Sequence, residues 1–277
     1  MADALPFGAL RTWEGAVGLA LLVAGIGLAL LAPILFEGDP LDLKGRPLTP
    51  PFVDPGLPLG TDRLGRDILA GLVHGARATL ATSAGVALIA LLVGSTVGAV
   101  AGYLGGFADE VLMRIADATQ TVPPFVLALA LVSVAGPTQP VIVAALAAGA
   151  WTGPARVVRA QVLSLRERPF VEASRLLGRS PLAVAVEVVL PNALGPIIAL
   201  ASVIVAGAIL AEAALSFLGL GDPNRASWGA LIAEGRSVLR TAPHVIFAPG
   251  LAVTATVLAV SLAGEGLAKA LARPGQE

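Results

Sequence analysis

Long apolar runs alternate with short polar segments along the whole chain. A helix needs about 20 apolar residues to cross the hydrocarbon core of a bilayer, and six runs approach or exceed that length. The second run contains no charged residue. The pattern predicts an all-α, polytopic membrane protein with six transmembrane helices, at residues 15–36, 80–104, 111–135, 140–158, 196–218 and 245–267.

Composition supports the same class. Of the 277 residues, 56% are hydrophobic and only 13% are charged, and the mean hydropathy is +0.85. Soluble domains carry roughly a quarter charged residues, so this chain is too apolar for an aqueous fold. There is no cysteine, which excludes disulfides, thiolate metal sites and a cysteine nucleophile. Two histidines are too few for a histidine-based metal site, and the net charge of −1 gives no indication of nucleic-acid binding.

The first apolar run is longer than the apolar core of a secretory signal peptide, and no clear small-residue cleavage site follows it. We therefore expect a retained first span, followed by a proline-rich external loop. At the end of this loop, Thr61 or Asp62 can cap a helix whose apolar face comprises Ile68, Leu69, Leu72 and Val73. This pattern predicts an amphipathic helix at the membrane surface. The alternative is a surface helix that only orients the second span.

The most structured polar insert, 171–196, lies between the fourth and fifth apolar runs. Pro169 suits the first position of a short helix, and Gly178 suits the left-handed residue that ends one. Ser180 and Pro181 can then begin a second helix, which runs to about residue 190 and changes direction at Pro191. The insert is therefore predicted to be a helix–glycine–helix elbow. So short a helix needs a neighbour, which is either the chain's own spans or a partner protein.

Charge near the span ends indicates the orientation. Six arginines are concentrated in the part of the chain that leads into and through the elbow: Arg156, Arg159, Arg166, Arg168, Arg175 and Arg179. Basic residues beside span ends favour the cytoplasmic side. We expect the elbow and both termini to be cytoplasmic and the proline-rich loop to be external.

Several residues within the apolar runs have more than one interpretation. Glu212 is costly in a bilayer unless it is neutral or paired, so it is either a pathway or gate residue or a structural hydrogen-bond acceptor. Arg114 and Asp117 can pair on one helix face. The remaining features are a small-residue series that permits close helix packing (Gly94, Gly98, Gly102), two prolines expected to kink the third span (Pro123, Pro124), and an expected interfacial anchor (Trp228).

The insert also resembles the cytoplasmic EAA signature of ABC-importer permeases. EASRLLG, followed by nine residues and VVLP, matches that signature at Glu172, Ala173, Gly178, Val188 and Pro191. Ser174 stands where the signature has a second alanine, and Val188 where it has isoleucine. Four longer segments resemble one branch of these permeases, the second permease subunit of dipeptide, oligopeptide and nickel importers: LGTDRLGRD with GAR (59–77), 102–117, 155–174 and 211–236.

The resemblance implies a mechanism and a set of partners. The short helix would be a coupling helix held by an ATPase subunit, through Glu172, Ala173, Ser174, Arg175, Gly178 and Pro191. A homologous second permease, two cytoplasmic ATPases and an external substrate-binding protein would complete the importer. ATP and Mg²⁺ would bind the ATPases, and this chain would be a transport subunit with no cofactor and no enzymatic activity. The sequence itself contains no phosphate-binding P-loop, since neither Lys44 nor Lys269 has the required glycine context.

Two other classes of membrane protein would require different sequence patterns. An ion-coupled secondary transporter needs broken helices and ion-binding acids at mid-membrane, and only Glu212 comes close. A membrane-embedded enzyme needs clustered histidines or acids on facing helices, or an activated nucleophile, and neither pattern is present. The resemblance leaves the cargo open among dipeptides, oligopeptides, a nickel chelate and a glutathione-like molecule.

The sequence suggests three parts. Residues 1–79 hold the first span, the external loop and the surface helix. Residues 80–271 form a five-helix permease core with the EAA-type loop at about 159–195, and residues 272–277 are a tail.

Overall fold

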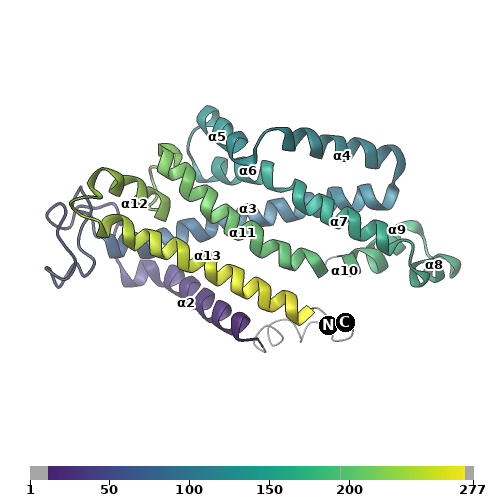
Figure 1. Ribbon diagram of the computed structural model, residues 1–277, viewed down its shortest axis with the longest axis horizontal. Coiled ribbons are helices and arrows are strands. Elements are labelled where there is room, and N and C mark those ends of the chain that lie inside the picture. The colour runs from purple at the N-terminus through teal and green to yellow at the C-terminus, as the bar shows by residue number, and fades with distance from the viewer. Residues whose placement is uncertain (1–11, 194, 272–277) are drawn as a thin grey trace.

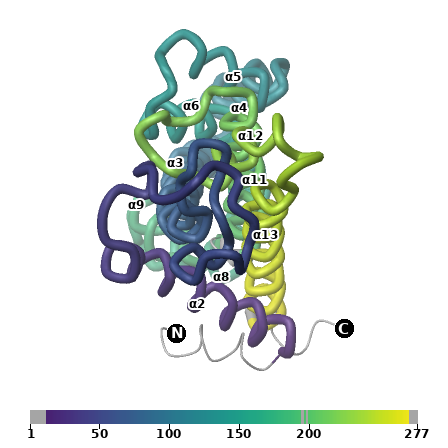
Figure 2. Tube along the Cα trace, turned by 90° about the vertical axis from the view of Figure 1, so that its left-hand side faces the viewer, coloured from purple at the N-terminus to yellow at the C-terminus, as the bar shows by residue number. Residues whose placement is uncertain are grey.

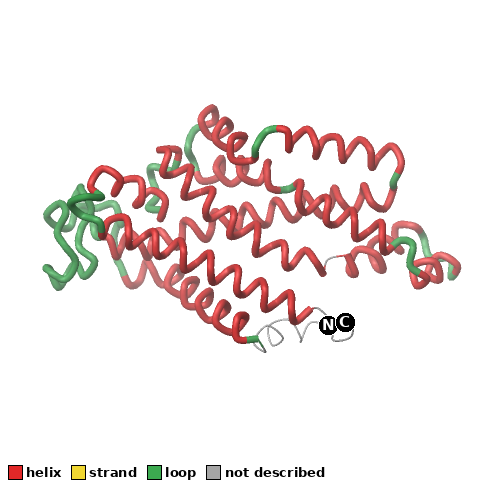
Figure 3. Tube along the Cα trace, viewed as in Figure 1, coloured by secondary structure: helices red, strands yellow, loops and turns green. Residues whose placement is uncertain are grey.

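The computed structural model describes residues 12–193 and 195–271, and these form an elongated helical bundle. The long helices run along the longest axis of the molecule (Figure 1). Loops gather at one end, where the proline-rich segment between α2 and α3 lies, and the short helix α8 projects from the opposite end (Figure 3). In the described residues the only β pairing consists of two isolated bridges, Leu43 with Arg66 and Thr61 with Asp67. The all-α prediction is confirmed.

Four helices in the described part are long and apolar enough to cross a membrane on their own, and two bent helix pairs each qualify when taken together. The six predicted spans are therefore present if each bent pair counts as one crossing. The four long helices are α2 (Trp13–Leu35), α3 (Ile68–Leu104), α11 (Gly195–Leu215), which continues into η2 (Ser216–Leu220), and α13 (His244–Leu271).

Prolines account for the sharper of the two bends. The helices α4 (Gly106–Thr121) and α5 (Pro124–Ala135) meet at 78°. Pro123 is extended there and Pro124 begins α5, so the kink predicted from these prolines is confirmed. The helices α6 (Gln139–Ala150) and α7 (Thr152–Leu165) meet at 41°.

Close packing of α3 on α7 depends on the predicted small-residue series. A Cβ atom on Gly94 would lie 2.4 Å from the Trp151 carbonyl oxygen, and one on Gly98 would lie 2.3 Å from the Ala155 carbonyl oxygen. A Cβ on Gly102 would lie 2.9 Å from the Arg159 carbonyl oxygen. Only glycine permits this approach, so the packing role predicted for the series is confirmed.

The separate amphipathic helix expected before the second span is absent. The helix α3 begins at Ile68, where the Asp67 carboxylate accepts the Leu69 amide at 2.8 Å, and continues unbroken for 37 residues. Asp62 instead accepts the Leu64 and Arg66 amides in a turn, and Thr61 donates to the Arg46 carbonyl. The predicted caps thus order the loop, and the apolar face of residues 68–73 belongs to the start of the span.

Short helices occupy both ends of the bundle. At the α8 end, α8 (Pro169–Leu176) is followed by α9 (Pro181–Ala183), the π-helix η1 (Val184–Val189) and α10 (Leu190–Ala193). At the loop end, α12 (Trp228–Gly235) and η3 (Arg236–Val238) precede α13. Figure 2 looks onto this end and shows the proline-rich loop lying across it, near α12. The predicted tail, 272–277, lies outside the described residues.

Candidate functional site

The elbow forms as predicted and has a defined left-handed end. Gly178 has φ +80°. Its amide donates to the Arg175 carbonyl at 3.0 Å, and the Arg179 amide donates to the Ser174 carbonyl at 3.4 Å. This pair of bonds is the Schellman motif, which satisfies the last carbonyls of a helix. Ser180 then caps α9 by accepting the Ala183 amide at 3.2 Å.

One side chain anchors α8 to the bundle. Val171 is 0% exposed and packs in a cluster with Val158 and Val162 of α7 and with Val184 and Val189 of η1. The rest of α8 is open. Leu176 and Leu177 are each 83% exposed, at the end of the molecule farthest from the proline-rich loop (Figure 1). Two adjacent leucines that expose most of their surface form an apolar tip at the end of α8, and Leu182 of α9 is also exposed.

The structure brings together most of the predicted coupling residues. Glu172, Ala173 and Arg175 are exposed on α8, and Ser174 is partly buried because its Oγ donates to the Phe170 carbonyl at 2.9 Å. Pro191 differs from the prediction. It lies inside α10, directly after the π-helix, rather than at a change of direction. The Leu190 amide reaches back five residues to the Ala185 carbonyl, and this wider turn lets the helical path continue through a proline.

Three polar contacts that the sequence did not reveal tie the elbow to α3, and α7, on which the elbow packs, to α3 and α4. Tyr103, the single tyrosine of the chain, donates from its hydroxyl to the Pro181 carbonyl at 2.6 Å. Arg166 donates to the Gly102 carbonyl at 3.2 Å. Arg159 of α7 makes a bidentate contact with Asp109 of α4, with Nη2 2.6 Å from Oδ2. A displacement of α8 would therefore reach α3 and α4 as well as α7. The lone tyrosine beside a span end was the one available sequence signal.

Asp117 pairs differently from the prediction. Its carboxylate lies 2.7 Å from Nη2 of Arg156 on α7, not against Arg114. The bend between α4 and α5 lays α4 along α7, so that a charge on the neighbouring helix is closer than one on the same helix.

At the opposite end, Glu212 belongs to a buried polar network between helices. It is 4% exposed. Its Oε1 accepts from Ser216 Oγ at 2.8 Å, and its Oε2 accepts from Thr79 Oγ1 of α3 at 3.3 Å. Ser216 Oγ also lies 3.5 Å from Ser227 Oγ, which caps α12. The network joins α3, α11 and α12, as expected for a carboxylate that fixes helix positions.

Trp228 lies in this region but is buried, so the prediction of an interfacial anchor is wrong. It is 5% exposed and donates from Nε1 to the Leu72 carbonyl at 2.9 Å. Gly75 on α3 permits this approach, because a Cβ there would lie 3.0 Å from the indole ring. The indole holds α12 against α3 instead of facing lipid.

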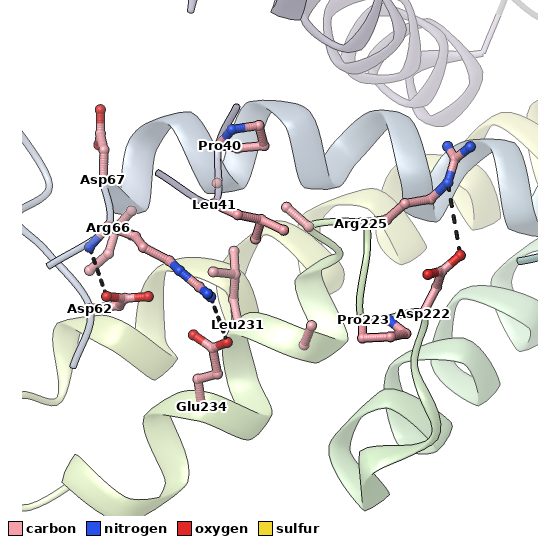
Figure 4. Close-up of a pocket in the computed structure, with 14 residues that line it drawn as sticks. Pro40, Leu41, Asp62, Arg66, Asp67, Asp222, Pro223, Arg225, Leu231 and Glu234 are labelled. Carbon is pink, nitrogen blue, oxygen red and sulfur yellow. Dashed lines mark hydrogen bonds and ion pairs between the residues drawn. The ribbon is translucent and has the colours of Figure 1, made fainter. Parts of the chain in front are cut away.

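The loop end also contains a polar cavity of about 190 Å³ between the proline-rich loop, α3 and α12 (Figure 4). Arg66 pairs with Glu234 at 3.0 Å, and Asp62 lies beside them. One atom of each of these three side chains is buried without a partner: Asp62 Oδ2, Arg66 Nε and Glu234 Oε2. Burial raises the pKa of Glu234, and the neighbouring Asp62 carboxyl adds to the rise, while Arg66 opposes it. The Arg66–Glu234 pair joins the proline-rich loop to α12.

The polar groups at the two ends do not form a metal site in the described part of the chain. Within residues 12–193 and 195–271, no group of three or more histidine or acidic side chains could hold a metal ion. The notable features are mechanical: a projecting elbow, two bent helix pairs and buried contacts that link helices.

Known proteins resemble this chain over most of its length. Residues 94–274 match the family model described as binding-protein-dependent transport system inner membrane component. The chain is 37% identical over 265 residues to the di/tripeptide transport system permease protein of Pseudomonas aeruginosa, covering 93% of this chain and 88% of that protein. It is 36% identical over 257 residues to the nickel transport system permease protein of Escherichia coli K12, covering 91% of each.

Two further comparisons agree. The glutathione transport system permease protein of Pectobacterium atrosepticum is 38% identical over 214 residues, covering 77% of this chain and 71% of that protein. Among solved structures, an inward-facing form of the MetNI methionine ABC transporter matches 74% of this chain and 98% of its own, with a TM-score of 0.59 and 20% identity. This structural likeness concerns the fold.

The family decides against both the secondary transporter and the membrane enzyme. It implies an external binding protein and ATPase partners, and a non-catalytic subunit in which no cofactor is expected. The family-model match over residues 94–274 and the three relatives show that the chain belongs to the family of binding-protein-dependent ABC-transporter inner membrane permeases.

Proposed function

We propose that this permease moves peptides, either dipeptides or oligopeptides, and that a nickel chelate is the nearest alternative cargo. Two of the three relatives described above are named for di/tripeptide and glutathione transport, and glutathione is itself a tripeptide. The third is named for nickel. In this proposal the chain lines half of a pathway, a homologous second permease lines the other half, and an external binding protein delivers the cargo.

We propose further that α8 is the coupling helix, seated in a groove on one of two ATPase subunits. The observation that carries this proposal is the apolar tip: Leu176 and Leu177 are 83% exposed on a helix that Val171 anchors from the other side. A partner that buries exposed leucines removes their apolar surface from water, and this burial stabilises the complex. Glu172 and Arg175 would form polar contacts around this apolar centre, and Gly178 would set the direction in which the chain leaves the partner.

The contacts of the elbow provide a route from the ATPase to the pathway. Closure of an ATPase dimer on ATP would move α8 as a rigid unit, because the Schellman motif and the Val171 anchor fix it to its neighbours. The Tyr103–Pro181 and Asp109–Arg159 contacts would then pass the displacement to α3 and α4. Alternating access is in this description a two-state equilibrium that ATP biases through a partner chain.

The same arrangement supports a cytoplasmic position for both termini. The start of α2 and the end of α13 lie side by side, joined by an ion pair of 2.9 Å between Glu14 and Lys269. Counting each bent pair as one crossing, both helix ends fall on the side from which α8 projects (Figure 1). We propose that this side is cytoplasmic and that the proline-rich loop is external.

A crosslink tests the coupling proposal directly, because the chain has no cysteine of its own. Ser174→Cys and Leu176→Cys would be introduced separately into the complete transporter in native membranes. We expect both to capture an ATPase subunit, with a yield that changes when ATP is added. Phe52→Cys, which is equally exposed but lies in the proline-rich loop, is the matched control and should capture none. Capture of only the chain's own helices by both α8 variants would refute the coupling role.

The cargo requires a separate measurement. The complete transporter with its binding protein, reconstituted in liposomes, would be offered a labelled dipeptide, a labelled pentapeptide and a nickel chelate in turn. We expect ATP-dependent uptake of a peptide. Uptake of the nickel chelate alone would refute the peptide proposal and leave the coupling proposal intact.

A further inference from the structure

A large apolar groove lies between the four long helices. It has a volume of about 870 Å³ and is lined by α2, α3, α11 and α13. Each of these helices contacts the next around the ring, α2 with α3, α3 with α11, α11 with α13 and α13 with α2. All the lining residues belong to this one chain, the groove is open to the surface on one side, and it is distinct from the elbow and from the Glu212 network.

Small side chains create this space. Ala81 and Ala84 face it from α3, Ala201 from α11, and Ala263 and Gly264 from α13. Packed interiors contain few voids of this size, because atoms that line an empty cavity lose their dispersion contacts. At membrane depth water does not fill so apolar a space, and hydrocarbon does. The groove thus has the shape and chemistry of a site for an acyl chain.

One charged residue lines the same groove. Arg77 is exposed, and within residues 12–193 and 195–271 it forms no ion pair or hydrogen bond. It is the last charged residue before an uncharged stretch, 78–108, that is long enough to cross the hydrocarbon. Its guanidinium is therefore placed at the outer boundary of the hydrocarbon region, where lipid phosphates lie. A cation at that depth attracts an anionic headgroup, and the described part of the chain gives Arg77 no anionic partner of its own.

The groove runs along much of the length of the bundle. It extends from Arg77 and Leu30 near the loop end to Leu267, two residues before Lys269, toward the opposite end. The Glu14–Lys269 ion pair lies beyond the far end, toward the α8 side. At the near end α2 and α3 meet, with His74 Nε2 3.0 Å from the Phe36 carbonyl oxygen.

We propose that this groove is a specific site for an anionic phospholipid whose headgroup lies at the loop end of the bundle. The phosphate contacts the Arg77 guanidinium, and one acyl chain lies between α2 and the other three helices. A bound chain fills the space that the alanines leave and holds α2 against the rest of the bundle. The proposal rests on the placement of the helices in a membrane and does not depend on the cargo.

Photoreactive phosphatidylglycerol, with a diazirine at the middle of one acyl chain, tests this site in the reconstituted complete transporter. Labelling of the wild-type chain should map to α2 and α3 beside the groove. Arg77→Gln should lower this labelling about fivefold, the factor expected for one guanidinium beside an anionic lipid surface. Ala84→Leu should lower it by obstructing the groove while leaving Arg77 in place.

Two control variants separate the site from general lipid contact. Arg240→Gln removes another exposed arginine of the loop end, and Ala130→Leu enlarges an exposed alanine of α5, and neither residue lines the groove. Both should label as the wild type does. Equal labelling of the wild type, Arg77→Gln and Ala84→Leu would overturn the proposal. Capture of the second permease by a single cysteine at position 84 would also overturn the proposal, because the groove would then be an interface between permeases.

Discussion

Gly178 offers the sharpest test of how the elbow works. Its φ of +80° lies in the left-handed region, which costs an L-residue about 1–2 kcal/mol. A Cβ atom added there meets nothing within 4 Å, so no steric clash adds to this cost. Gly178→Ala is therefore expected to reduce the population of the intact Schellman turn by about 5- to 30-fold while leaving the surface of α8 unchanged.

The consequence should appear in coupling rather than in assembly. Uptake and ATP hydrolysis would be measured together in proteoliposomes, and the ratio of cargo moved to ATP hydrolysed compared among variants. We expect Gly178→Ala to lower this ratio and Gly178→Val to lower it further, because a β-branched residue tolerates positive φ least. Gly178→Asn should retain more of the ratio than alanine, since asparagine adopts this conformation more readily.

A control and a refuting result complete the test. Gly27→Ala, in α2, also has no atom within 4 Å of the added Cβ and has no left-handed backbone, so it should leave the ratio unchanged. Wild-type coupling in Gly178→Val would show that the turn does not transmit motion. Equal loss in the alanine and asparagine variants would show that the backbone conformation is not the cause.

Three further predictions concern packing, the buried carboxylate and pH. Gly98→Ala should lower the melting temperature of the purified protein by several degrees, because the added Cβ would lie 2.3 Å from the Ala155 carbonyl oxygen, whereas Gly27→Ala should not. Glu212→Leu should destabilise the protein by about 1–3 kcal/mol, since the Thr79 and Ser216 hydroxyls lose the carboxylate that accepts from them. Glu212→Gln should remain folded and active. A stable but inactive Glu212→Gln would instead establish that Glu212 is a gate residue. Burial raises the pKa of Glu234 above its ordinary value of 4.5. The stability that the protonated Glu234 carboxyl contributes to the fold is therefore complete below pH 4.5, and it is lost as pH rises through the raised pKa. The melting temperature of Glu234→Gln relative to wild type should therefore increase with pH, and a flat or falling difference would contradict this sign.

The elbow shows how far local sequence rules reach. Proline at a first helical position, glycine at a left-handed end and serine at a cap are properties of single residues and their immediate neighbours, and all three appear where they were predicted. The same is true of Pro123 and Pro124, because the kink follows from a missing amide and a fixed φ.

Where two local rules compete, the sequence does not decide. Thr61, Asp62 and Asp67 are all good helix caps. The structure uses Asp67, because Asp62 is already occupied with the amides of Leu64 and Arg66 in the loop. A predicted surface helix thus became the first turns of a 37-residue span. Trp228 is a second case, since only the packing of α12 on α3 shows that its indole is buried.

The sequence by itself determined the membrane class, the number of apolar runs, the elbow and the family, because hydrophobicity, backbone preference and motif spacing are read along one dimension. Only the tertiary structure decided which charges pair, which polar atoms are left without partners, and where an apolar groove meets a free arginine. Asp117 pairs with Arg156 and Tyr103 holds Pro181 because helices far apart in sequence lie side by side. Those contacts depend on helix rotation and bend angle, which many residues set jointly and no local pattern records.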